Sequence, residues 1–107
     1  HKDSIGSRDV IKSGDVQWMT AGRGIIHEEY HSREFSKSGG IFEMCQLWVN
    51  LPKKDKMTKP NYQAILSSDI ASIDIETDND VAGKVRVISG SYEGMKGPAK
   101  TFTPVEL

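Results

Sequence analysis

The chain has 107 residues, of which 36% are hydrophobic and 27% charged, a balance that is ordinary for one small folded domain. Its formal net charge of −1 gives no electrostatic reason to bind nucleic acid or an anionic membrane surface. The apolar runs are too short to span a membrane, and no secretory signal pattern is present. The lone cysteine, Cys45, excludes a disulfide framework and favours a reducing compartment, the cytoplasm. It lies in an apolar segment, so we expect it to be buried and unreactive.

Hydrophobic alternation predicts a mostly β protein, because no stretch repeats with the period of a helix. We expect strands at residues 10–11, 16–20, 25–31, 41–51, 70–76, 84–89 and 101–107, and one short strand or irregular segment within 57–65. The strongest candidate is 41–51, which is apolar on both faces as in a covered central strand. Glycines in 20–24 predict a tight connection, 32–40 reads as a polar loop, and 78–80 reads as a turn. We expect Trp18 and Trp48 to pack in the core.

His27, Glu29 and His31 recur at spacing two in the expected strand 25–31. Side chains alternate across a strand, so these three residues would point from one face. Two imidazoles and a carboxylate suit iron, zinc or manganese, but they are also ordinary polar residues for the open face of a strand. A metal site would need ligands from another strand, and the only other histidine is His1.

A longer motif bears on whether these residues form a metal site or are ordinary exposed polar residues. Residues 14–29, Gly-Asp-Val-Gln-Trp-Met-Thr-Ala-Gly-Arg-Gly-Ile-Ile-His-Glu-Glu, closely resemble the signature of the pirin family. Further segments that resemble pirins lie at 46–52 and 85–90, and at Lys56-Met57, Pro60, Tyr62-Gln63 and Thr103-Pro104.

This resemblance implies an all-β fold that is part of a cupin, or jelly-roll, β-barrel. Pirins are bicupins, with two such barrels in a chain of about twice this length or more. We expect residues 1–66 to be the second half of the N-terminal cupin, and 67–107 to be a connecting segment and the start of the C-terminal cupin. The chain would then be a fragment, and its exposed strand edges favour a dimer or a strand-swapped assembly.

The resemblance also implies a non-haem iron held by three histidines and one glutamate. It places the third histidine and the glutamate on His27 and Glu29, while the other two come from an H-x-H motif that this sequence lacks. Iron, or another divalent metal, is expected in the intact protein, and the fragment alone is expected to be metal-free or to bind metal weakly. His31 could be a third ligand here, although a role outside the metal's coordination is favoured.

Two functions from different classes follow from the resemblance. The first is a quercetin 2,3-dioxygenase-type enzyme acting on a flavonol-like small molecule, with Glu29 as a ligand that could also accept the substrate's hydroxyl proton. The second is a redox-responsive regulatory module that binds a protein partner without turnover. For the fragment itself, little or no catalysis is expected.

Overall fold

The computed structural model describes residues 1–78 and 80–107. The turn expected at 78–80 includes Asn79, which lies outside the described residues. The described chain is mostly strand and irregular structure, with one short α-helix, which confirms the all-β expectation. Its backbone divides into two compact units, and each is described by itself: unit 1 is 1–10 with 20–61, and unit 2 is 11–19 with 62–107. The expected division at residue 66 stays a prediction. No helix among the described residues is long and apolar enough to cross a membrane.

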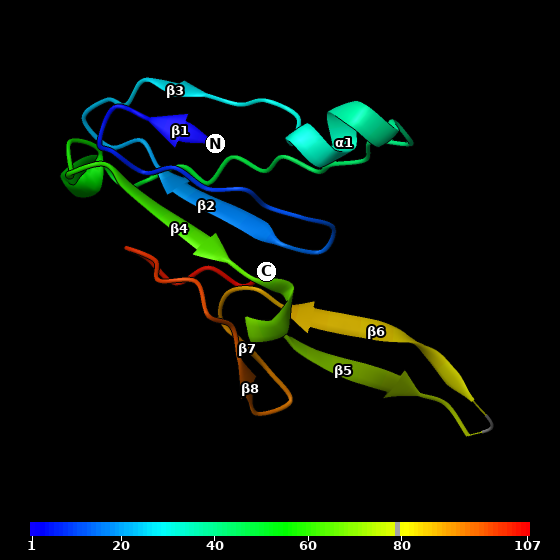
Figure 1. Ribbon diagram of the computed structural model, residues 1–107. Helices are drawn as coiled ribbons and strands as arrows, with labels where there is room; N and C mark the ends of the chain where they lie inside the picture. Colours follow the sequence, from blue (N-terminus) through cyan, green and yellow to red (C-terminus); the bar gives the residue numbers. More distant parts are fainter. Residues whose placement is uncertain (79) are drawn as a thin grey trace. The chain divides into compact units, whose positions relative to one another are not determined.

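Unit 1 is organised on a short antiparallel ladder. Strand β1 (Lys2–Asp3) pairs with strand β3 (His27–Glu28), so that Lys2 lies opposite Glu28 and Asp3 opposite His27 (Figure 1). Only two residues of the strand expected at 25–31 therefore enter a ladder. The strand expected at 10–11 is absent from the structure, and the nearby backbone contact is instead an isolated bridge between Lys2 and Arg8.

Helix α1 (Arg33–Ser38) replaces part of the polar loop expected at 32–40, so that prediction was wrong for these six residues. The Ser32 side-chain oxygen caps its first turn by accepting the Phe35 amide at 3.1 Å. At the other end, the Gly39 amide donates to the Phe35 carbonyl at 2.8 Å, and Gly39 has a positive φ of 66°. The two caps provide hydrogen bonds at the ends of the helix. A search for helical periodicity does not detect a helix this short.

The segment 41–51 is not a strand, although its sequence made it the strongest candidate. It follows an irregular path and is solvent-exposed over most of its length, with Ile41 at 88% and Trp48 at 91% exposure. The expected core position of Trp48 is therefore wrong, and Cys45 is exposed rather than buried. A strand needs hydrogen-bonding partners on its edges, and no described segment supplies them here. The expected self-association of the chain stays a prediction.

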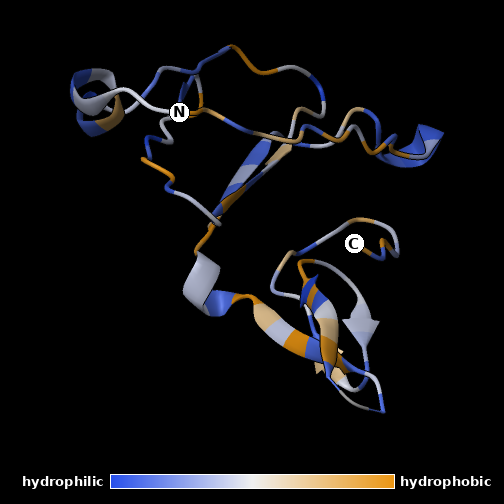
Figure 2. Cartoon of the chain, turned by 90° about the vertical axis from the view of Figure 1, so that its right-hand side faces the viewer, coloured by the Kyte–Doolittle hydropathy of each residue, from blue (hydrophilic) through white to orange (hydrophobic). Residues whose placement is uncertain are grey.

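The 3₁₀ turn Lys53–Asp55 leads toward strand β4 (Asn61–Ile65), which is seen beside β2 (Val16–Thr20) in Figure 1. Strand β2 matches its expected range and pairs with β4. A second 3₁₀ turn, Ser67–Asp69, leads into the antiparallel hairpin of β5 (Ala71–Glu76) and β6 (Val81–Val87). Strand β5 agrees closely with the prediction of 70–76, whereas β6 overlaps the predicted 84–89 but begins three residues earlier and ends two residues earlier. Figure 2 shows hydrophobic and hydrophilic residues alternating along this hairpin, as a half-covered strand pair requires.

The core of unit 2 is small. Its buried hydrophobic residues are Ile65, Ile70 and Val87, each no more than 6% exposed. Strands β7 (Ser91–Tyr92) and β8 (Met95–Lys96) form a short hairpin beyond them. The final strand expected at 101–107 is absent as a regular element, although Leu107 and Ser89 exchange two backbone hydrogen bonds of 3.0 Å.

Asp15 joins two distant parts of unit 2. Its carboxylate accepts the backbone amides of Lys12 at 2.8 Å and Ser67 at 2.7 Å. Arg86 completes the junction by donating to the Gly14 carbonyl at 2.6 Å and to the Ser67 hydroxyl at 3.2 Å. The two amides, with smaller contributions from the positive charges of Lys12 and Arg86, hold the pKa of the Asp15 carboxyl below its ordinary value of 3.8.

This lowered pKa predicts an acid-sensitive contribution to stability. Folding favours the ionised carboxylate, so the stabilisation is complete above about pH 3.8 and disappears as the pH falls through the lower folded pKa. We expect Asp15→Asn, which keeps one acceptor but loses the charge, to lower the free energy of unfolding at pH 7. The deficit should shrink as the pH falls below 3.8. Urea unfolding across this range measures it, and a deficit that is independent of pH would contradict the assignment.

Gly97 is required by close packing of the backbone. A Cβ atom at this position would collide with the backbone of Ile88 and Ser89, whereas one at Gly83 in β6 would meet no atom within 4 Å. Neither glycine has a positive φ, so the two positions differ mainly in the space available.

We therefore expect Gly97→Ala to destabilise the fold by about 1–3 kcal/mol, the usual cost of forcing an extra carbon into a filled site. Gly83→Ala is the matched control and should be neutral or slightly stabilising, because alanine has less freedom to lose in a strand. Urea or thermal unfolding of both variants checks this. Equal stability of the two would show that the backbone around Gly97 relaxes freely.

Candidate functional site

A glycine turn leads the chain into β3. Gly22 has a φ of +52°, and a Cβ atom there would collide with the Thr58 carbonyl. That carbonyl accepts the Arg23 amide at 2.9 Å, and the Gly24 amide closes the turn on the Ala21 carbonyl at 2.9 Å. The Thr58 carbonyl therefore holds the turn at Gly22 and Arg23. The tight connection expected at 20–24 is confirmed.

The side chains of His27 and Glu29 are exposed, one at the start of β3 and the other just after its end. Asp3, opposite His27 in the ladder, shares its face of the strand pair, and one further step of the same register would set His1 opposite Glu29. Glu28 lies on the other face, where it approaches the Lys2 ammonium at 3.9 Å. Of the two expected metal donors, His27 therefore lies in the ladder and Glu29 just beyond its end, and both are exposed.

Beside these exposed donors, His1 and Asp3 form a buried pair that the sequence analysis did not single out. The His1 Nε2 atom lies 2.8 Å from Asp3 Oδ2, and the two side chains are 1% and 0% exposed. The His1 ring also stacks on the His27 ring, with centroids 6.0 Å apart and planes inclined by 23°. Alternation along residues 1–3 could have suggested the shared face of His1 and Asp3, but their place beside His27 depends on pairing across more than twenty residues.

His31 belongs to a different cluster. Its ring stacks on Phe42 at 5.0 Å and meets the edge of Phe35 at 5.2 Å, and the two phenylalanines are 5.9 Å apart. These contacts hold α1 against the beginning of the exposed segment 41–51. The sequence left the role of His31 open, and the structure gives it an aromatic packing role.

The donor types suit a first-row metal, but the set is small. An imidazole and a carboxylate fit iron, zinc or manganese. Among the described residues, however, no group of three or more histidine, cysteine, aspartate or glutamate side chains is arranged to hold a metal ion. His27 and Glu29 therefore fit such a metal in kind, as part of a coordination shell that would need further donors.

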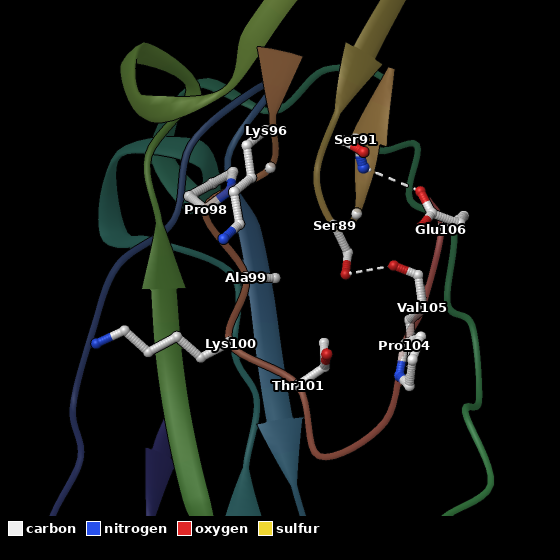
Figure 3. A pocket seen from close by; sticks show the side chains of 12 residues that line it. Ser89, Ser91, Lys96, Pro98, Ala99, Lys100, Thr101, Pro104, Val105 and Glu106 are labelled. Atoms are coloured by element: carbon white, nitrogen blue, oxygen red, sulfur yellow. Dashed lines mark hydrogen bonds between the residues drawn. The ribbon is translucent and has the colours of Figure 1, made fainter. Parts of the chain in front are cut away.

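A concave surface lies in unit 2, away from His27 and Glu29 in the sequence. It has a volume of about 810 Å³ and is lined by residues of 89–91, 96–101 and 104–106 (Figure 3). Two of its polar groups form hydrogen bonds with other residues of the lining. Ser89 Oγ donates to the Val105 carbonyl at 2.7 Å, and the Glu106 carboxylate accepts the Ser91 amide at 2.9 Å. Figure 3 shows the Lys100 side chain extending away from both. The lining contains no histidine or cysteine, and the frequent glycine and proline breaks after residue 89 are the only sequence signal for it.

Comparison with known proteins identifies the class. Residues 1–49 match the pirin family profile. The whole chain is 52% identical, over 107 residues, to a Pseudomonas aeruginosa protein provisionally named quercetin 2,3-dioxygenase, and covers 36% of that protein. It is 43% identical over 104 residues to Pirin-1 of Arabidopsis thaliana, covering 97% of this chain and 32% of the relative.

A crystal structure of quercetin 2,3-dioxygenase from Acinetobacter baumannii superposes with a TM-score of 0.89 at 53% identity, over 98% of this chain and 35% of that one. The strands described above are therefore part of a cupin-type β fold. The chain is thus similar to the pirin family over residues 1–49 and to pirin-like relatives over nearly its whole length, and it spans about a third of the length of the curated relatives it matches.

The packing of His31 is open to a direct test. We expect His31→Ala to loosen the cluster with Phe35 and Phe42, and so to speed amide hydrogen exchange at Phe35 and Gly39, whose N–H groups cap α1. Tyr30→Ala is the neighbouring control, since Tyr30 is 75% exposed. Exchange that is unchanged in His31→Ala would remove His31 from the support of α1.

Proposed function

We propose that this chain supplies part of the metal centre of a quercetin 2,3-dioxygenase-type cupin, with His27 and Glu29 as two of the metal ligands. The observation that carries the proposal is that both side chains are exposed, one at the start of β3 and one just past its end, in a chain that superposes closely on a solved quercetin 2,3-dioxygenase. The names of the Pseudomonas and Acinetobacter relatives support a flavonol-like substrate. We further propose iron as the metal and the cytoplasm as the compartment.

Each proposed ligand has a separate task. The His27 imidazole offers a neutral nitrogen donor, and the Glu29 carboxylate offers a charged oxygen donor two residues later. When bound, a redox-active metal would supply Lewis acidity and orient the substrate's oxygen atoms. Glu29 is also a carboxylate base on an open face, so it can accept and hold the proton of an acidic substrate hydroxyl.

The two further histidines implied by the family resemblance are not among the three histidines of this chain. A pair of donors lacks the number and preorganisation needed for tight metal binding. We therefore expect the 107-residue chain by itself to bind metal weakly. The metal site is best tested in the full-length gene product.

We expect His27→Ala and Glu29→Gln to lower quercetin-dependent O₂ uptake by the Fe(II)-loaded full-length gene product by about 100-fold or more, the usual loss when a metal ligand or a general base is removed. Bound iron, measured by elemental analysis, should fall in His27→Ala. Glu28→Gln is the matched control, because Glu28 lies between the two ligands but on the opposite face of the ladder. It should retain both activity and iron.

An iron-loaded wild-type protein that consumes neither quercetin nor O₂ would contradict the enzymatic part of this proposal. The regulatory reading would then be the one to pursue. Full iron content in both His27→Ala and Glu29→Gln would contradict the ligand assignment independently of activity.

A further inference from the structure

We propose that His1 is a positioning residue for His27, with its ring forming a fixed platform that holds the His27 imidazole in the orientation in which it binds metal. This inference rests on the proposed function, because it concerns one of the two proposed ligands. It adds a residue that lies outside the resemblance-derived ligand set.

The first support is the contact between the two rings. Their centroids are 6.0 Å apart and their planes are inclined by only 23°, which is within the range of offset aromatic pairs. His27 is otherwise an exposed side chain at the start of a two-residue strand. A ring of this kind would turn freely about its side-chain bonds, and a stacked neighbour on one side restricts that freedom.

The second support is that the platform is itself anchored. His1 Nε2 lies 2.8 Å from Asp3 Oδ2, and the other carboxylate oxygen accepts the amides of Ile5 at 3.0 Å and Ser7 at 2.9 Å. Both side chains of the His1–Asp3 pair are almost completely buried. A buried pair with all its partners in place has one arrangement, because any other would leave a polar group without a hydrogen bond.

The third support is the ladder. Asp3 is the register partner of His27, so the anchor and the proposed ligand are fixed to each other through the backbone of β1 and β3. The Ser4 amide extends this connection by donating to the Ile26 carbonyl at 2.9 Å. The contact between the two rings is therefore set by a rigid frame rather than by two mobile side chains that happen to meet.

Hydrogen-bonded neighbours of metal-binding histidines commonly contribute 10- to 100-fold to metal affinity, in part by fixing the orientation of the ring. A stacked ring acts on the orientation alone, so we expect an effect of His1 at the lower end of this range. A simpler role for His1 is only to satisfy Asp3 and so hold the turn 3–7. The two roles differ in what they need: the turn needs a hydrogen-bond donor for Asp3, and the platform needs a flat ring.

The variants His1→Gln and His1→Phe separate these needs. His1→Gln keeps a donor for Asp3 but has no ring, and His1→Phe keeps a ring but has no donor. We expect His1→Gln to weaken Co(II) binding to the full-length gene product about tenfold or more and to alter the visible absorption of the bound Co(II). His1→Phe loses the hydrogen bond to Asp3, but the β1–β3 ladder still places its ring against His27, so its affinity should stay within about threefold of wild type. Lys2→Ala, on the same strand but the opposite face, is the matched control and should bind as wild type does.

A metal-free measurement tests the geometry separately. In the wild-type protein, NMR should show nuclear Overhauser contacts between the ring protons of His1 and His27, and the His27 ring signals should shift in His1→Gln. Absence of these contacts in a folded protein would overturn the proposal, and so would His1→Gln with wild-type Co(II) affinity and spectrum. If His1→Gln does not fold, a folded His1→Phe decides: near wild-type affinity supports the platform, and a tenfold loss overturns it. A wild-type protein that binds no Co(II) would instead contradict the proposed function itself.

Discussion

The carboxylate of Asp3 is the group on which the candidate site depends. It accepts two backbone amides that close the turn 3–7, and it lies against the buried ring of His1. Because Asp3 also faces His27 across the β1–β3 ladder, one side chain connects a turn, a buried imidazole and the strand that carries the proposed ligands. A two-residue ladder has few hydrogen bonds of its own, so this carboxylate provides much of the order in this part of unit 1.

Unit 2 is ordered in a different way. Its buried hydrophobic residues are few, and long-range polar links do much of the joining: Asp15 and Arg86 bring the segment before β2 to the turn before β5. Gly97 adds a second kind of constraint, because it lets one backbone segment lie directly against another. Small cores leave less stabilisation from apolar burial, so individual polar links and tight backbone contacts matter more.

The sequence predicted those elements whose partners are local or whose pattern is complete within a few residues. Strands β2, β5 and β6 alternate clearly, and the glycine turn before β3 contains its own signal. The apolar segment 41–51 failed for the opposite reason: its composition indicates a covered strand, but strand formation depends on partners that no described segment provides. Helix α1 was missed because a serine cap and an aromatic cluster hold it, neither of which appears as a helical period.

The same distinction applies to the site. The spacing of His27 and Glu29 could be interpreted from sequence because alternation along a strand is a local property. The spacing of His31 looked equivalent, yet the ladder ends at Glu28 with Glu29 just beyond it, and the His31 ring packs against Phe35 and Phe42. The proposed contribution of His1 depends on the register of β1 on β3, which no single-strand pattern contains. What results is a face with rigid, buried support on one side and solvent on the other. A metal-dependent enzyme needs both properties in one place, because its ligands must be held still while its substrate must still reach them.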